Sequence, residues 1–291
     1  MRMEVTVIRG CSSAPHARAA MLLGALACSM LVVALATGSP ALAAPSGREL
    51  LDEAKRLNDT SRAWNDSSQR LAIVIHDADG RERKREMVIK TRRDHDAGDK
   101  SLSVFLEPPE VRGTAFLQVT HAGRDAEQWI YFPEGQRVRQ IGGSSKDDSF
   151  MGSNFSYRDL ELMTELVNWT ADDADAKVLA VTDQDGMQVH SIELVPHKED
   201  VGYKRFVLLL STPDHVQRGI EFYSDGSEPK KVLRLTKIET IDGIPTPLQL
   251  EMKTPSGGYT VVDVSDVRYN QNIDANVFTK RTLERALETV Q

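Results

Sequence analysis

The sequence has little cysteine, few aromatic residues and no excess of positive charge. Its two cysteines, Cys11 and Cys28, lie within the first 43 residues, and aromatic residues make up 6% of the 291-residue chain. If that segment is removed, the chain retains no thiol for a disulfide, a nucleophile or a metal site. The chain holds 36 lysines and arginines against 43 aspartates and glutamates. This balance does not attract nucleic acid, so we expect no nucleic-acid partner.

Motifs of the common catalytic and cofactor sites are also missing. The sequence has no His-Glu-x-x-His zinc motif, no Gly-x-Ser-x-Gly nucleophile turn and no phosphate-binding loop. The acidic segments 172–175 and 183–186 begin like calcium loops but lack the later glutamate ligand. We interpret the first as a solvated acidic loop and the second as a hairpin turn, with calcium binding as the alternative. We therefore expect no catalytic residue, no metal and no cofactor.

The first 43 residues have the layout of a secretory signal peptide. Basic residues precede an apolar run over residues 19–36, and the small-residue motif Ala41-Leu42-Ala43 follows Pro40. This order predicts export and cleavage before Ala44. An uncleaved membrane anchor is the alternative, because the apolar run approaches the roughly 20 residues that span a bilayer. The remaining residues, 44–291, are predicted to form a single domain.

That domain is predicted to be mainly β. Turn signals such as Asp-Gly, Glu-Gly and Gly-Gly recur between runs of strand-forming residues, which indicates a long antiparallel meander. Helices are expected at residues 47–57, 157–167 and 274–290, and Ser156 is expected to cap the second. We expect about a dozen strands, at residues 71–75, 86–91, 102–106, 115–119, 128–132, 137–141, 188–195, 206–210, 219–223, 232–238, 248–252 and 260–267.

Two of these runs, 71–75 and 206–210, are apolar on both faces. Such strands need cover on both sides. Because few helices are available, we expect a curled, incompletely closed barrel with helices over part of it. The pattern leaves open whether the interior is empty for a ligand or filled by side chains. Leu208 is our candidate for an inner-face residue. The pattern does not say which face of its strand is interior, so Leu209, on the other face, is the paired control.

Aromatic and basic residues alternate on two neighbouring predicted strands. Trp129 and Tyr131 share one face of the first, and Arg137 and Arg139 share one face of the second. These four are candidates for contacts with a ligand, the arginines with its headgroup. The alternatives are that the aromatic residues pack in the core and that the arginines form ion pairs with nearby aspartates at positions 147, 148 and 159.

Phe150 and Met151 stand in a polar, glycine-rich segment, where solubility alone would not place them. We interpret them as a flap over an opening, with core packing of Phe150 as the alternative. Three further apolar or aromatic candidates follow closely, namely Phe155, Tyr157 and Leu160.

This region resembles the LolA-like family of outer-membrane lipoprotein-sorting proteins. The most specific part is Asp-Ser-Phe-Met-Gly-Ser at residues 148–153, followed by Phe155, Tyr157 and Asp159-Leu160. Ser-Val-Phe-Leu-Glu-Pro-Pro and Gly-Thr-Ala-Phe precede it, and the resemblance in layout extends over most of residues 44–291. It implies a Gram-negative periplasmic protein with a strongly curved antiparallel sheet, an unclosed barrel whose opening is covered by helices, and no catalytic residues.

In that family the concave apolar face receives acyl chains. The resemblance therefore implies a periplasmic carrier that binds the acyl chains of a lipoprotein or lipid and passes it towards the outer membrane. An inner-membrane transporter and an outer-membrane acceptor are the further partners expected. The alternative is a non-enzymatic envelope adaptor or sensor, associated with a transporter, whose interior is filled by its own side chains.

Overall fold

An antiparallel sheet of 13 strands forms most of the computed structural model, which describes residues 44–94, 98–121, 124–184 and 186–290. The predicted signal peptide, residues 1–43, lies outside the described residues. The strands are β1 (Asp66–His76), β2 (Glu82–Arg92), β3 (Lys100–Glu107), β4 (Ala115–His121), β5 (Arg124–Phe132), β6 (Arg137–Ile141), β7 (Ala174–Gln184), β8 (Met187–Pro196), β9 (Arg205–Thr212), β10 (Gln217–Tyr223), β11 (Lys231–Ile241), β12 (Ile244–Lys253) and β13 (Tyr259–Tyr269).

Helices are few and mostly short. The α-helices are α1 (Gly47–Asp59), α2 (Tyr157–Glu165) and α3 (Lys280–Leu283). The 3-10 turns are η1 (Gly143–Asp147), η2 (Phe150–Gly152), η3 (Leu166–Asn168), η4 (Ala275–Val277) and η5 (Ala286–Thr289).

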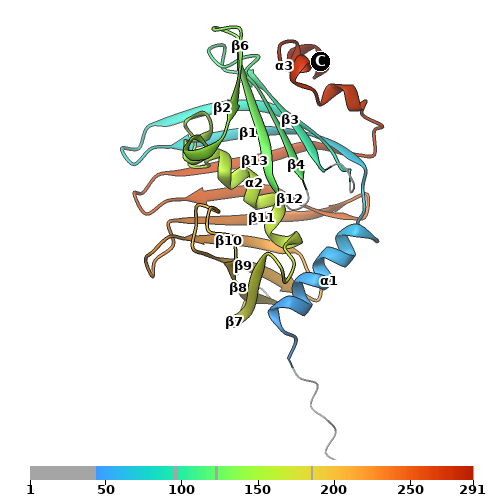
Figure 1. Ribbon diagram of the computed structural model, residues 1–291, viewed down its shortest axis with the longest axis vertical. Coiled ribbons are helices and arrows are strands. Elements are labelled where there is room, and N and C mark those ends of the chain that lie inside the picture. The colour runs from blue at the N-terminus through green and yellow to red at the C-terminus, as the bar shows by residue number, and fades with distance from the viewer. Residues whose placement is uncertain (1–43, 95–97, 122–123, 185, 291) are drawn as a thin grey trace, which may run out of the picture. The chain divides into compact units, whose positions relative to one another are not determined.

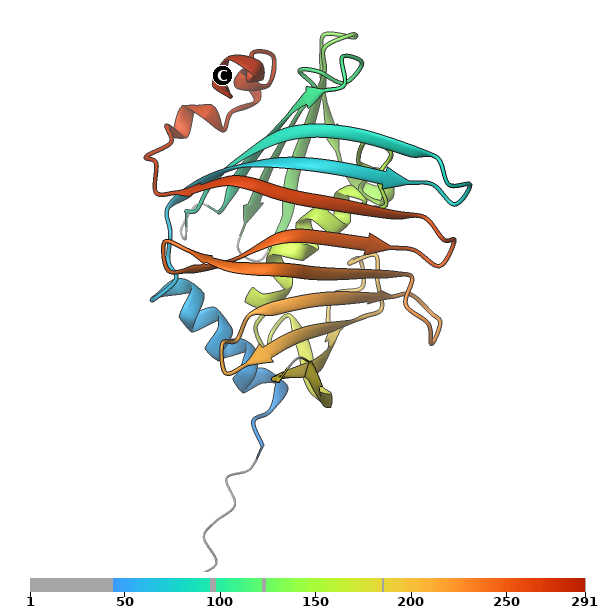
Figure 2. The ribbon, with the colours of Figure 1, turned by 180° about the vertical axis from the view of Figure 1, so that it is seen from behind.

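The sheet consists of two meanders joined in the middle. Its strand order is β6-β5-β4-β3-β2-β1-β13-β12-β11-β10-β9-β8-β7, so β1 pairs with β13 at the centre, and β6 and β7 are the two edges. Figure 2 shows β2, β1 and β13 side by side across the back of the sheet. Because the edge strands do not pair with each other, the barrel is not closed.

The segment between the two edge strands determines which face of the sheet is covered. Residues 142–173 connect β6 to β7 and carry α2 across the concave side of the sheet, where α1 also lies (Figure 1). In Figure 1 the strands β3 to β6 run steeply across the direction of β11 to β13, which shows how strongly the sheet curves. We call the face covered by α1 and α2 the inner face.

Two main groups of buried apolar residues lie on opposite faces of the sheet. The inner cluster contains inner-face residues of nearly all strands together with residues of α1 and α2. The outer cluster joins Leu102, Val104, Leu117 and Trp129 to the C-terminal segment through Phe278 and Leu283. In this second group the segment after β13 folds back over the outside of β3, β4 and β5, as Figure 1 shows for α3.

The expected fold class is confirmed, with two differences in detail. A thirteenth strand, β7, begins at Ala174, within the acidic residues 172–175 that we expected to form a loop. Its run Val178-Leu179-Ala180-Val181 is apolar, but it is an edge strand whose side chains are mostly exposed, so its pattern is weak. The expected C-terminal helix 274–290 is also wrong, because this segment forms η4, α3 and η5 instead.

Candidate functional site

The inner face of the sheet is a continuous apolar surface built from alternate strand residues. Leu208 of β9 is fully buried in the inner cluster, whereas Leu209, its neighbour, packs on the other face with Val189, Val207 and Tyr223. The two faces of β9 are therefore both buried, as its sequence predicts. Strands far apart in sequence contribute to the inner face, including Leu71, Ile73 and Ile75 of β1 and Phe206, Leu208 and Leu210 of β9.

Helix α1 covers one end of this face. Ser46 caps it in a capping box with Glu49, and Leu50, Leu51 and Ala54 point into the inner cluster. Arg48 donates hydrogen bonds to the carbonyl oxygens of Trp169, Thr170 and Ala174, so α1 is attached to the segment before β7 and to the first residue of β7.

Helix α2 is held over the inner face by buried charged groups. Ser156 caps it as expected, in a capping box with Asp159. The fully buried Asp159 carboxylate also accepts from the Tyr203 hydroxyl at 2.7 Å and from Lys231 Nζ at 2.5 Å. Burial and the neighbouring Asp159 charge raise the pKa of the Tyr203 hydroxyl, so it remains a donor. This network ties α2 to β11 and to the segment before β9.

A second network ties α2 to the other half of the sheet. Glu161 accepts from Lys146 Nζ at 2.8 Å and from the backbone N–H of Ala126 at 2.9 Å. Arg158 donates to Asp147 at 2.6 Å through Nε. Since Ala126 lies in β5 while Lys146 and Asp147 lie in η1, α2 is joined by polar contacts to both halves of the open sheet.

Phe150 closes the inner cluster at the N-terminal end of α2. Its ring lies 5.4 to 5.7 Å from the rings of Phe105, Phe116 and Tyr157, and the side chain is only 5% exposed. Phe150 is therefore a core side chain in this structure rather than an exposed flap. It nevertheless belongs to the short turn η2 and not to a strand or long helix.

The backbone of that turn is constrained. Met151 has φ 51°, a left-handed conformation that is uncommon for residues with a side chain. Arg83 donates to the carbonyl oxygen of Gly152 at 3.1 Å, and Arg85 donates to that of Met151 at 3.4 Å. Gly152 has φ 76°, a left-handed conformation that favours glycine, and Arg83 Nη1 lies where a side chain at this position would begin. We call residues 150–152 with these contacts the Phe150 turn.

Trp129 and Tyr131 lie on the opposite side of the sheet from α2. They belong to the outer cluster, where Lys280 of α3 lies 4.0 Å over the Trp129 ring. Ile130, between them, points into the inner cluster. The sequence correctly gives the shared face of Trp129 and Tyr131, but it does not say which face is the inner one.

Arg137 and Arg139 are exposed on the edge strand β6. Within the described part of the chain, neither forms an ion pair with Asp147, Asp148 or Asp159, and Asp147 instead pairs with Arg158 while Asp159 binds Lys231. The alternative in which these arginines neutralise nearby aspartates is therefore wrong. Contact with a headgroup stays a prediction for them.

The remaining sequence candidates lie at the inner face. Phe155 and Tyr157 are buried in the inner cluster, and Leu160 packs against it while partly exposed. Sequence reasoning missed the charged residues around them, above all Lys146, Glu161 and Arg85. Glu161 follows Tyr157 by four residues, a spacing that places it on the covered side of α2. A glutamate on a short helix is usually solvated, so its burial could not be predicted from this spacing.

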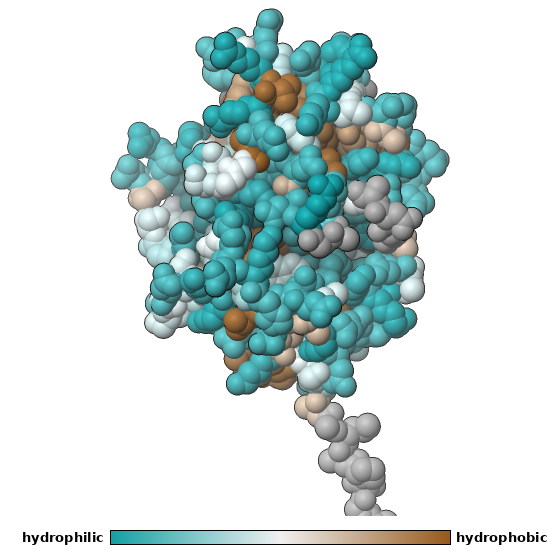
Figure 3. All heavy atoms as spheres, in the orientation of Figure 1, coloured by the Kyte–Doolittle hydropathy of each residue, from teal (hydrophilic) through white to brown (hydrophobic). Residues whose placement is uncertain are grey.

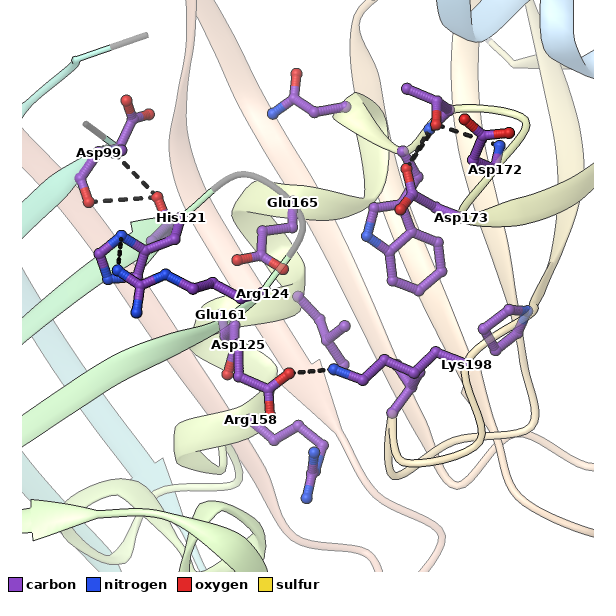
Figure 4. A pocket seen from close by; sticks show the side chains of 18 of the residues that line it. Asp99, His121, Arg124, Asp125, Arg158, Glu161, Glu165, Asp172, Asp173 and Lys198 are labelled. Atoms are coloured by element: carbon purple, nitrogen blue, oxygen red, sulfur yellow. Dashed lines mark hydrogen bonds and ion pairs between the residues drawn. The ribbon is translucent and has the colours of Figure 1, made fainter. Parts of the chain in front are cut away.

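The sequence does not decide whether the interior holds an empty apolar cavity or is filled by side chains. Two cavities at the surface of the described residues have charged side chains in their lining, and neither lies inside the inner cluster. One of about 530 Å³ lies at the β1–β2 turn beside Asp77 and Arg83. The other, of about 680 Å³, is a cleft beside α2 lined mainly by charged residues (Figure 4). The buried inner-face side chains pack against one another and against residues of α1 and α2, so the inner face is filled by its own side chains. The side on which α2 lies is mostly hydrophilic (Figure 3).

Among the residues that the structure describes, no group of three histidine, aspartate or glutamate side chains is placed to hold a metal ion. No helix in the same residues is long and apolar enough to cross a membrane.

Comparison with known proteins identifies the family. Residues 97–285 match the profile of a protein family described as uncharacterized. The chain belongs to that family. Among curated proteins, none matches the sequence. The fold of this family member is LolA-like, because a LolA superfamily protein from Nitrosomonas europaea superposes with a TM-score of 0.60 at 18% identity, over 82% of this chain and 100% of the other.

Two solved structures are more similar to this LolA-like chain. One is a domain from Vibrio parahaemolyticus named for outer membrane lipoprotein sorting, with 27% identity, a TM-score of 0.74 and coverage of 82% of this chain and 98% of the other. The second is a DUF1329 family protein from Desulfovibrio piger, also with 27% identity and a TM-score of 0.74, over 81% of this chain and 98% of the other. The resemblance found in the sequence is confirmed.

Proposed function

We propose that the chain is a periplasmic protein that binds the acyl chains of a lipid or lipoprotein between the inner face of the sheet and the helices α1 and α2. The observation that carries the proposal is the continuous apolar inner cluster, which crosses both halves of an open sheet and has two helices over it. The Vibrio relative named for lipoprotein sorting supports the same class of cargo.

Because the inner face is filled by its own side chains, an acyl chain enters only if part of the cover moves. The Phe150 turn is the part that we propose to move. It is held by two arginine–carbonyl contacts and by hydrogen bonds of Phe150 with Ser153 and Phe155, so it has fewer hydrogen bonds to break than a strand paired along its length. Its movement removes Phe150 from the aromatic group formed with Phe105, Phe116 and Tyr157. An acyl chain then takes the place of the ring.

The magnitudes favour this exchange. Uncovering a buried phenylalanine costs about 3 kcal/mol, whereas a chain of about 14 carbons gains about 11 kcal/mol at ~0.8 kcal/mol per buried CH₂, before the cost of association. Binding is therefore favourable, and release is the harder step. Return of Phe150 to its place in the inner cluster recovers its own burial, which assists transfer to a partner.

As a carrier, the protein would receive its cargo at the inner membrane and pass it towards an outer-membrane acceptor, without catalysing a reaction. The predicted signal peptide at residues 1–43 supports export to the periplasm. One observation favours the second candidate, a non-enzymatic adaptor or sensor associated with a transporter. The inner face is filled by the protein's own side chains, so an adaptor or sensor of this kind needs no cargo to complete its core.

A binding experiment separates the two candidates. The chain without residues 1–43 is stripped of lipid and titrated with a fluorescent fatty acyl probe. Saturable binding that phospholipid displaces supports the carrier. Absence of binding by a folded protein rejects the carrier and leaves the adaptor.

A further inference from the structure

The cleft beside α2 combines a charged rim with an apolar floor. Its volume is about 680 Å³, and its walls come from the last turn of α2, the start of β5, the loop between β8 and β9, and the end of α1. Leu162 and Val201 line it and also belong to the inner cluster, and Trp169 packs against that cluster. The cleft is thus the place where the polar surface meets the apolar interior.

The basic side chains that line the cleft already have acidic partners. The ion pairs are Lys146–Glu161, Lys198–Asp125, Arg158–Asp147, Arg124–Glu127, Lys55–Asp59 and Arg93–Asp99. Glu165 differs from these acids. Within the described residues its carboxyl group has neither a hydrogen bond nor an ion pair, although it is mostly buried, and in Figure 4 its side chain projects from the helix into the open space.

The surroundings of Glu165 disfavour its negative charge. Burial raises its pKa to about 8, the charges of Glu161 and Asp125 add to the effect, and Lys146 and Lys198 oppose it. Glu165 also stands at the C-terminal end of α2, where the helix dipole is unfavourable for an anion. Near neutral pH the group therefore carries a proton and lacks a cation to pair with.

We propose that this cleft binds the cationic end of an amphiphile, with Glu165 as the counter-ion of an ammonium group and with Leu162, Trp169 and Val201 in contact with the beginning of its apolar chain. The inference rests on the proposed function, because it names the chemistry at the polar end of the same cargo. A ligand with a negative end does not gain this partner, since the basic residues of the cleft are already paired.

Binding of the ammonium group is coupled to loss of a proton. As the cation approaches, the Glu165 carboxyl group releases its proton to solvent and becomes the carboxylate. Below the pKa of about 8 this release opposes binding, so the affinity increases by about tenfold for each pH unit from pH 6 towards pH 8. Above that pH the affinity levels off.

The experiment uses the chain without residues 1–43, titrated calorimetrically at pH 6, 7 and 8. Decylammonium and decanoate have chains of the same length but opposite charge, and ethylammonium carries the same charge without the long chain. The test variant is Glu165→Gln, which imitates the protonated form and should fold. Glu199→Gln is the matched control, because Glu199 is an exposed acid of the β8–β9 loop that does not line the cleft.

We expect decylammonium to bind more tightly than decanoate and ethylammonium, with an affinity that increases with pH in the wild type and in Glu199→Gln but not in Glu165→Gln. Equal pH dependence in Glu165→Gln would overturn the assignment of the counter-ion. If ethylammonium binds as tightly as decylammonium, the cleft recognises only the amine, and the proposal of an amphiphilic ligand is wrong. If decylammonium and decanoate bind equally, this inference fails while the proposed function stands. If neither binds, the proposed function fails as well.

Discussion

Lys146 and Glu161 form an ion pair at 2.8 Å in which both side chains are less than one tenth exposed. The pair joins η1, which follows the edge strand β6, to α2 over the inner face. Because the second oxygen of Glu161 binds the backbone N–H of Ala126, the same carboxylate connects η1, α2 and β5. The position of α2 therefore depends on an ion pair that is largely buried.

Replacing one partner of this pair leaves the other charge buried and uncompensated. We expect Lys146→Met to lower the free energy of unfolding by about 3 to 5 kcal/mol in urea denaturation. Lys198→Met is the matched control, since Lys198 and Asp125 are both more than half exposed and their pair contributes at most about 1 kcal/mol. Equal losses in the two variants would contradict the structural role given to Lys146.

The raised pKa of Glu165 predicts a pH dependence of stability. The folded state holds this proton up to a pH of about 8, whereas the unfolded state loses it near 4.5, so the folded protein binds more protons between these values. The free energy of unfolding should therefore fall as the pH rises from about 4.5 to 8, by about 3 to 5 kcal/mol from this group. In Glu165→Gln this part of the fall should disappear, which denaturation at pH 5, 7 and 9 measures. An unchanged profile would refute the prediction.

Leu208 and Leu209 provide a test of which face receives the cargo. Both are buried, so replacement by alanine should cost about 2 to 5 kcal/mol at either position. Only Leu208→Ala opens space at the inner face, which an acyl chain can fill, so it should bind the acyl probe several-fold more tightly. The same gain in Leu209→Ala would mean that the inner face is not the binding surface.

Phe150→Ala should increase the rates at which an acyl probe enters and leaves, because it removes the side chain that closes the inner cluster. The expected loss of stability is about 3 to 5 kcal/mol. Phe278→Ala is the control, since Phe278 is equally buried but lies in the outer cluster. Stopped-flow fluorescence measures the rates. If both variants leave them unchanged, the Phe150 turn is not the moving part.

Exposed arginines without ion pairs should contribute little to stability. We expect the double variant Arg137→Gln and Arg139→Gln to change the free energy of unfolding by less than about 0.5 kcal/mol. If these arginines contact a headgroup, the same variant should bind less well to vesicles containing anionic lipid, in a sedimentation assay at low salt. Undiminished vesicle binding would remove them from the candidate site.

Much of the fold could be predicted from the sequence because turn signals and strand periodicity are local. The twelve expected strands are present, and Ser156 caps α2 as its spacing with Asp159 indicates. The edge strand β7 was missed because its exposed side chains weaken the alternation that marks a half-buried strand.

The site was harder to predict than the fold. Trp129 and Tyr131 share a face of the sheet as expected. Which face α2 covers depends on the path of residues 142–173, and α2 covers the face opposite to these two side chains. The charged contacts of α2 are formed by residues far apart in the chain, such as Asp159 and Lys231, and no local pattern predicts them. For the same reason the sequence gives no sign of the unpaired carboxyl group of Glu165.

Native mass spectrometry of the protein purified from the cell envelope tests the central claim most directly. The account predicts a population heavier than the protein without residues 1–43 by the mass of a lipid or a lipoprotein, with the added mass lost on delipidation and restored by adding lipid. A protein that carries no lipid as purified, and takes up none after delipidation, would contradict it.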